Sequence, residues 1–135
     1  MFTAIDHLGI AVPELDPAVA SYRASFGMVL VHREEIADQG VEVAVLEAGN
    51  DHVELVAPLS ETSSIARFIA TRGPGLHHVA YRVADIDAAL DELRGREVEL
   101  IDQRPRHGIR DSRIAFIHPR SAGGVLTEIV QPGHA

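Results

Sequence analysis

Two glutamates of this 135-residue chain stand inside apolar, strand-like segments. Glu54 lies between a valine and a leucine, and Glu128 lies between a threonine and an isoleucine. Because successive side chains of a strand point to opposite faces of a sheet, each carboxylate points away from the face on which its neighbours pack. One reading is that both simply face water on the solvated side of a sheet. The other is that they serve chemistry, since an unpaired buried carboxylate is costly.

An internal repeat favours the second reading. When the sequence is aligned with itself so that His7 falls on His78, similar residues coincide over much of each half. After a short slip at a Gly- and Ser-rich turn, Glu54 falls on Glu128. Such self-similarity indicates two copies of one supersecondary unit.

If the two copies pack with pseudo-twofold symmetry, their equivalent residues meet. We therefore predict one divalent ion held by His7, Glu54, His78 and Glu128. Two imidazoles and two carboxylates suit a borderline ion, Co²⁺ in the first place, with Mn²⁺, Ni²⁺ or Zn²⁺ as alternatives. Such a site leaves room for a substrate with two oxygens, such as a malonyl thioester, whose acidic C–H lies between a thioester carbonyl and a carboxylate. Coordination would stabilise the enolate that forms when this proton leaves.

The remaining histidines are expected to face solvent or to make local hydrogen bonds: His32, His77, His107, His118 and His134. His77 neighbours His78 and so should point to the opposite face. His52 shares the parity of Glu54 and could orient the metal ligands from behind.

Arginines form a second candidate set. Five of them fall in one short C-terminal stretch: Arg104, Arg106, Arg110, Arg113 and Arg120. Guanidinium groups recognise phosphates and carboxylates through paired hydrogen bonds. We expect Arg106, with Arg104 or Arg113, to contact the carboxylate or the phosphates of an anionic substrate. The alternative is a basic loop that faces solvent.

The elements that position these residues are predicted to occur in the same order twice. In the first copy, residues 4–12 are expected to form a strand and Asp16 and Pro17 to begin an amphipathic helix, which Gly27 ends. Its apolar face is predicted to hold Val19, Tyr22 and Phe26. Three strands should follow, at residues 28–32, 41–47 and 52–56.

The second copy repeats this βαβββ series. Its helix is expected to be capped by Asp85 or Asp87, to bury Ile86, Ala89, Leu90 and Leu93, and to end at Gly95. Strands are predicted near residues 97–102, 112–117 and 125–131. The predicted fold is α+β, one domain in which the two modules form a curved sheet with a metal-binding cleft. Module 1 covers about residues 1–60, a linking helix about residues 61–72, and module 2 about residues 73–135.

Composition excludes several classes of protein. The chain is 46% hydrophobic, which is enough for a buried core, and it has no cysteine for disulfides, thiolate zinc sites or thiol catalysis. The net charge of −8 argues against a nucleic-acid partner. The first residues lack the basic start and the long apolar stretch that are typical of a signal peptide, and no apolar run is long enough for a membrane span, so a cytoplasmic protein is expected.

These candidate residues lie in segments that resemble methylmalonyl-CoA epimerases, a family of the vicinal oxygen chelate superfamily to which glyoxalase also belongs. The resemblance spans nearly the whole chain and rests on residues 5–12, 53–59, 75–80, 104–108, 116–120 and 123–128. It implies the same four metal ligands, paired βαβββ modules, an acyl-CoA substrate and a homodimer. The implied reaction interconverts (2R)- and (2S)-methylmalonyl-CoA through a metal-stabilised enolate.

One position departs from the family pattern. Several bacterial epimerases carry a glutamate base on the third strand, where this chain has Val43, and the adjacent Glu42 should face the wrong way. Glu47 has the parity of Val43 but lies farther along the strand. We therefore expect Glu54 and Glu128 to exchange the substrate proton, as metal-bound glutamates do in glyoxalase.

Two other functions fit the same pattern. A glyoxalase-like lyase or isomerase acting on a glutathione-type thiol adduct would use the same ligands. A non-catalytic small-molecule-binding protein of the same fold typically lacks the metal ligands and lines its cleft with aromatic side chains. Here the ligands are intact, and aromatic residues make up only 4% of the chain.

Overall fold

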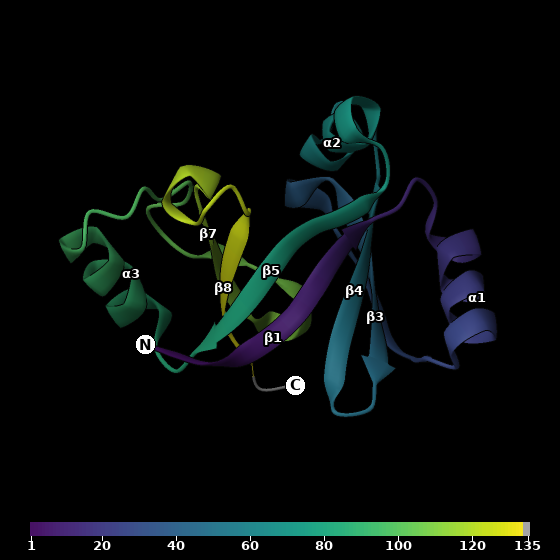
Figure 1. Ribbon diagram of the computed structural model, residues 1–135, viewed down its shortest axis with the longest axis horizontal. Coiled ribbons are helices and arrows are strands. Elements are labelled where there is room, and N and C mark those ends of the chain that lie inside the picture. Colours follow the sequence, from purple (N-terminus) through teal and green to yellow (C-terminus); the bar gives the residue numbers. More distant parts are fainter. Residues whose placement is uncertain (134–135) are drawn as a thin grey trace. The chain divides into compact units, whose positions relative to one another are not determined.

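Each half of the chain folds into the same series of elements (Figure 1). The computed structural model describes residues 1–133. The first half contains β1 (Phe2–Ala11), α1 (Leu15–Phe26), β2 (Val29–Ile36), β3 (Val41–Ala48) and β4 (Asp51–Pro58). The second half contains β5 (Gly75–Val83), α3 (Ile86–Gly95), β6 (Arg106–His107), β7 (Arg113–Ile117) and β8 (Thr127–Gln131). Helix α2 (Ser64–Arg72) links the halves. The predicted α+β class and the repeated βαβββ series are confirmed.

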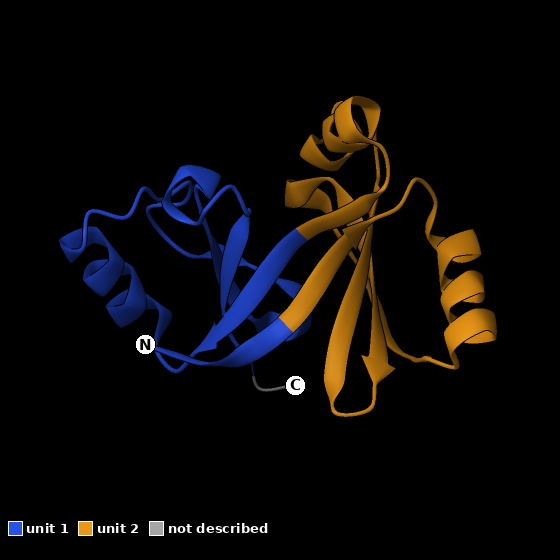
Figure 2. Cartoon of the chain, viewed as in Figure 1, with its two compact units in different colours: residues 1–6, 78–135 blue, residues 7–77 orange. Residues whose placement is uncertain are grey.

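The chain divides into two compact units, coloured separately in Figure 2. Unit 2 holds residues 7–77, whereas unit 1 holds residues 1–6 together with the chain from His78 onward. Strands β1 and β5 therefore each contribute to both units. The units differ from the predicted modules because the first residues of β1 lie along β5, where Phe2 stacks on Tyr81 at a ring distance of 4.7 Å.

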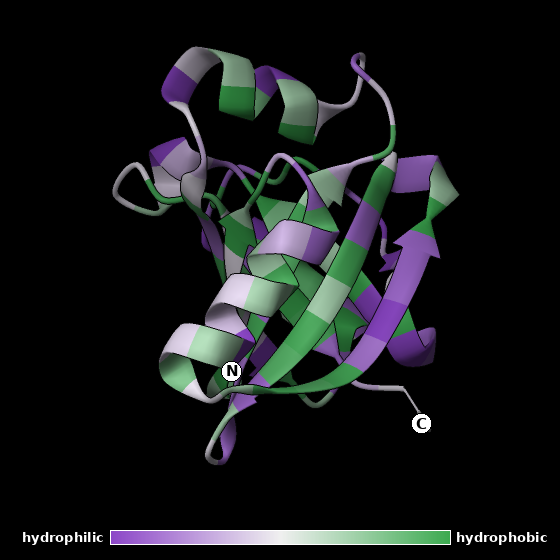
Figure 3. Ribbon diagram, turned by 90° about the vertical axis from the view of Figure 1, so that its right-hand side faces the viewer, coloured by the Kyte–Doolittle hydropathy of each residue, from purple (hydrophilic) through white to green (hydrophobic). Residues whose placement is uncertain are grey.

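In unit 2, the strands lie in the order β2-β3-β4-β1. Strand β1 runs parallel to β4, and the other neighbours are antiparallel. Helix α1 covers one face of this sheet, where Leu15 and Val19 pack against Ala44, Leu46 and Leu55. The outer side of α1 is mostly pale or purple in Figure 3, as expected of an amphipathic helix. The opposite face of the sheet carries Glu54.

In unit 1, β5 runs parallel to β8, and β8, β7 and β6 are antiparallel neighbours. Helix α3 covers one face with the four residues predicted from the sequence, which are all buried: Ile86, Ala89, Leu90 and Leu93. They pack against Ala115, Ile117 and Ile129 of the sheet. The opposite face carries Glu128, so both units leave a glutamate on the face that their helix does not cover.

The helix caps match the prediction only in part. Asp85 caps α3, because its side chain accepts a hydrogen bond from the Ala88 N–H at 3.1 Å. Gly27 ends α1 in the left-handed conformation, with φ of 65°. The predicted start of α1 is wrong. The helix begins two residues earlier, with Glu14 at the N-cap and Asp16 inside the first turn.

The strand predicted near residues 97–102 is also wrong. Glu97 has a left-handed backbone, with φ of 61°, and only Leu100 forms an isolated bridge, to Ile117. The equivalent of β2 in this half is the two-residue strand β6. At the predicted place, the backbones of Ile101 and Glu99 still pair with Phe116 and His118, through the Ile101 N–H to the Phe116 carbonyl and the His118 N–H to the Glu99 carbonyl, both at 2.9 Å. The Asp102 side chain adds one bond, because its Oδ2 accepts the Phe116 N–H at 2.9 Å. Phe26, predicted to be part of an apolar face, is 67% exposed.

Within residues 1–133, no helix is both long and apolar enough to cross a membrane.

Candidate metal centre

His7 and Glu54 form a pair of low exposure in unit 2. Strands β1 and β4 run side by side with Gly9 opposite Glu54, and His7, two residues before Gly9, lies on the same face. The Nδ1 atom of His7 lies 3.0 Å from Oε2 of Glu54. The side chains are 2% and 12% exposed.

His78 and Glu128 form the corresponding pair in unit 1. Ala80 of β5 lies opposite Glu128 of β8, and His78 occupies the next position on that face. The Nε2 atom of His78 lies 3.4 Å from Oε2 of Glu128, with side chains 6% and 8% exposed. The ring of Phe116 meets the His78 ring edge-on, with centroids 5.8 Å apart. Phe116 also lies opposite Glu128 in the β7–β8 register.

The two pairs are built by one rule. In each unit, a histidine stands two residues before a small residue on one strand, and the glutamate stands opposite that small residue on the parallel neighbour. Imidazole nitrogens and carboxylate oxygens, gathered where little water reaches, are suitable ligands for a borderline divalent ion. The donor set of each unit therefore fits the predicted kind of cofactor.

Comparisons with known proteins assign the family. The profile of the Glyoxalase/Bleomycin resistance protein/Dioxygenase superfamily matches residues 6–116. An ethylmalonyl-CoA/methylmalonyl-CoA epimerase of Cereibacter sphaeroides is 35% identical over 97% of this chain and 99% of its own length. The crystal structure of methylmalonyl-CoA epimerase from Mycobacterium tuberculosis matches with 46% identity and a TM-score of 0.93, over 98% of this chain and 89% of that one. A variant of Streptomyces coelicolor methylmalonyl-CoA epimerase in complex with 2-nitronate-propionyl-CoA matches with 37% identity and a TM-score of 0.96, over 99% and 97% of the two chains.

The chain belongs to the methylmalonyl-CoA epimerase family of the glyoxalase superfamily. The predicted resemblance, the vicinal oxygen chelate fold and the isomerase class are thereby confirmed, because the relatives are epimerases.

Position 43, where several bacterial epimerases carry a glutamate, is a valine in this chain. Val43 lies opposite Val56, on the face that carries Glu54. Glu42 faces the side of α1, as predicted: it lies opposite Ala57 and accepts a hydrogen bond from Arg33 Nε at 2.8 Å. Glu47 lies beside His52, with 3.9 Å between Oε1 and Nε2. Its carboxylate thus lies at the hairpin end of β3.

Two other histidines differ in their surroundings. His77 packs edge-on against Phe68 of α2, with ring centroids 4.9 Å apart, rather than facing solvent. Burial lowers the pKa of His77 to about 4, so this imidazole is neutral at physiological pH. His118 makes the expected local contacts, accepting the Arg120 N–H at 3.0 Å. His134 lies outside the described residues.

The candidate arginines of this family member lie on different faces. Arg106 lies opposite Ile114 and therefore on the face of Glu128. Arg113 lies on the other face, where its two terminal nitrogens donate to Asp87 of α3 at 2.9 and 3.2 Å. Arg104 is exposed in the loop before β6. Sequence reasoning missed Arg82, although its even spacing from His78 places it on the same face of β5; its guanidinium is bonded to Asp6.

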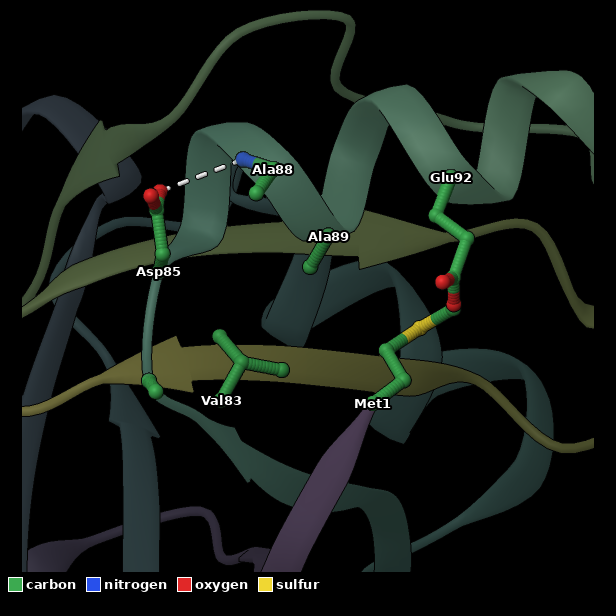
Figure 4. A pocket seen from close by; sticks show the side chains of 7 residues that line it. Met1, Val83, Asp85, Ala88, Ala89 and Glu92 are labelled. Carbon is green, nitrogen blue, oxygen red and sulfur yellow. Dashed lines mark hydrogen bonds between the residues drawn. The ribbon is translucent and has the colours of Figure 1, made fainter.

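A separate pocket of about 200 Å³ lies at the start of α3 in unit 1, between Met1, Val83 and Glu92 (Figure 4). Its ionisable side chains are acidic, and Asp85 is already bonded to the Ala88 N–H. This lining disfavours an anionic acyl-CoA, so the paired histidines and glutamates remain the candidate site.

Proposed function

We propose that this chain is a metal-dependent epimerase of methylmalonyl-CoA, which inverts C2 by removing a proton from one side of the carbon and delivering a proton to the other. The supporting observation is the repetition of an imidazole–carboxylate pair of low exposure in the same register in both units. The substrate class is supported by the relatives, which are epimerases of methylmalonyl-CoA or ethylmalonyl-CoA by name.

His7, Glu54, His78 and Glu128 would together hold one divalent ion, Co²⁺ in the first place, with Mn²⁺, Ni²⁺ and Zn²⁺ as alternatives. When bound, such an ion supplies Lewis-acid polarisation, which makes the proton at C2 more acidic.

The chain's own carboxylates would move the proton. Glu54 as a carboxylate would accept the proton on one side of C2 while Glu128 as a carboxylic acid delivers a different proton on the other side, and the two residues would exchange these roles for the opposite epimer. His7 and His78 would keep each carboxylate oriented, because each imidazole nitrogen lies within 3.4 Å of its glutamate.

The cationic side chains would recognise the charged parts of the acyl-CoA. Arg106 is the first candidate, since it lies on the face of Glu128, and Arg104 and Arg113 are further candidates. The bonds between Arg113 and Asp87 make Arg113 the weakest of the three. A homodimer that acts in the cytoplasm completes the proposal.

Proton-to-deuterium exchange at C2 of methylmalonyl-CoA in heavy water tests this function. We expect exchange that a chelator abolishes and that added Co²⁺ restores. Exchange that persists without metal would contradict the metal role. Absence of exchange, with turnover of a glutathione hemithioacetal instead, would favour the glyoxalase-like alternative.

A further inference from the structure

Asp102 connects Arg106 to β7, the strand that pairs with β8 and so flanks Glu128 in unit 1. Its carboxylate is only 10% exposed and accepts two hydrogen bonds from different elements. Oδ1 accepts from Arg106 Nε at 2.7 Å, and Oδ2 accepts from the Phe116 N–H at 2.9 Å. A charge this little exposed is favourable only with such partners.

The second partner places Asp102 close to the proposed chemistry. Phe116 lies opposite Glu128, and its ring contacts the His78 ring. Arg106 lies opposite Ile114, two residues before Phe116 on the same face of β7. One carboxylate therefore fixes a cation relative to the strand that flanks the His78–Glu128 pair.

Arg106 is held differently from the arginines around it. Arg113 uses both terminal nitrogens on Asp87, and Arg94 uses both on Asp91 and the Gln103 carbonyl. Arg106 is bonded through Nε, and within residues 1–133 its two terminal nitrogens make no bond to the protein. Its side chain is 42% exposed. A guanidinium held by Nε presents both terminal N–H groups to an external oxyanion.

We propose that Asp102 is a positioning residue, which holds Arg106 so that its terminal nitrogens bind an oxyanion of the substrate. This inference rests on the proposed function, because that function makes the substrate an acyl-CoA. The oxyanion has two sources in such a molecule, the phosphates of CoA and the carboxylate of the acyl group. Both accept paired bonds from one guanidinium.

Arg106→Gln, Asp102→Asn and the double variant test the proposal. In Asp102→Asn, the amide oxygen can still accept the Phe116 N–H, but the amide nitrogen is itself a donor and cannot accept Arg106 Nε–H. Arg106→Lys keeps the charge but loses the fork. Arg96→Gln is the matched control, since Arg96 is 70% exposed and pairs with Glu92 in α3.

Two measurements separate the sources. Calorimetry with free CoA needs no turnover, and steady-state kinetics compare methylmalonyl-CoA with methylmalonyl-pantetheine, which lacks the phosphates. If Arg106 binds phosphate, Arg106→Gln should weaken CoA binding about tenfold or more and leave the KM for the pantetheine substrate unchanged. If it binds the acyl carboxylate, KM should rise for both substrates while CoA affinity stays the same.

Asp102→Asn should reproduce part of the effect of Arg106→Gln, in CoA affinity or in KM, whichever Arg106→Gln changes. Its kcat should stay within about twofold of wild type. The double variant should be no worse than Arg106→Gln, because both changes remove one interaction. The inference is overturned if Arg106→Gln changes neither CoA affinity nor either KM, or if the two losses add. Because CoA binding is read without catalysis, a failure of the proposed reaction remains distinguishable from a failure of the arginine site.

Discussion

At the scale of single residues, Glu54 and Glu128 differ from the other acidic side chains in combining low exposure with an imidazole partner. If they carry the proton, Glu54→Gln and Glu128→Gln should each lower the epimerisation rate about a hundredfold or more, because an amide cannot act as a base. Glutamine keeps an oxygen for metal, so both variants should still bind Co²⁺. Epimerisation rates with metal content measured on the same samples check this prediction.

Glu47→Gln is the matched control for this experiment. Glu47 is 43% exposed and lies on the same face of its sheet as Glu54, next to the turn that joins β3 and β4. We expect it to keep the wild-type rate. Wild-type rates in both Glu54→Gln and Glu128→Gln, with metal bound, would contradict the assignment of the bases.

The metal-ligand candidates could be proposed from the sequence for two reasons. Side chains alternate between the two faces of a strand, and the internal repeat aligns each histidine and glutamate of one half with its counterpart in the other. Asp102 could not, since its role depends on a non-strand segment that brings its carboxylate to Arg106 and to the Phe116 backbone. The sheet face on which Arg113 lies could not be predicted from the sequence either. It depends on where β7 starts and on its register with β8, which the amino-acid composition does not determine.

At the scale of elements, the equivalent helices α1 and α3 have different N-caps. Asp85 caps α3 with a side-chain hydrogen bond, whereas Glu14 at the same position of α1 makes none. Asp85→Ala should therefore lower the free energy of unfolding by about 1 kcal/mol, and Glu14→Ala by much less. Denaturant unfolding of the two variants measures this difference. Equal losses would show that the hydrogen bond seen at Asp85 contributes little.

The start of α3 is also tied to β7 by the pair of Asp87 and Arg113. This hydrogen bond lowers the pKa of Asp87 below its ordinary value of 3.8. A lowered carboxyl pKa stabilises the fold above the unfolded value, and this contribution is lost as the pH falls through the folded value. Arg113→Gln should thus be less stable than wild type at neutral pH, with the difference shrinking in acid. A difference that is constant with pH would contradict this linkage.

The length of strands was the least predictable feature at this scale. The apolar residues of 97–102 suggested a strand, yet Leu100 is buried by α3 packing while the left-handed Glu97 breaks the extended run. Helix α3 was predicted with its buried face correct, since four apolar residues at helical spacing leave one orientation. The spacing of apolar residues in a helix predicts which residues are buried from the local sequence alone, whereas a short strand forms only with pairing partners that are distant in the sequence.

At the scale of the whole molecule, the repeat gives the same βαβββ series and the same histidine–glutamate register in both units. The self-alignment of the sequence was sufficient to predict this duplication. It could not predict the compact units, because β1 and β5 each contribute to both of them. The central proposal about the molecule is that the two pairs share one ion rather than binding one each.

Metal stoichiometry decides between these arrangements. With one shared ion, wild type should hold one equivalent of Co²⁺ per chain, and His7→Ala and His78→Ala should each lose nearly all of it, because each removes a ligand of the same site. With separate ions, each variant should retain half of the wild-type content. His32→Ala is the control: its imidazole is bonded to Glu34 at 2.8 Å on β2, so full occupancy is expected. Metal content of dialysed protein and the Co²⁺-dependent rise in thermal stability give two independent readings, and retention of half the metal in both ligand variants would rule out a shared centre.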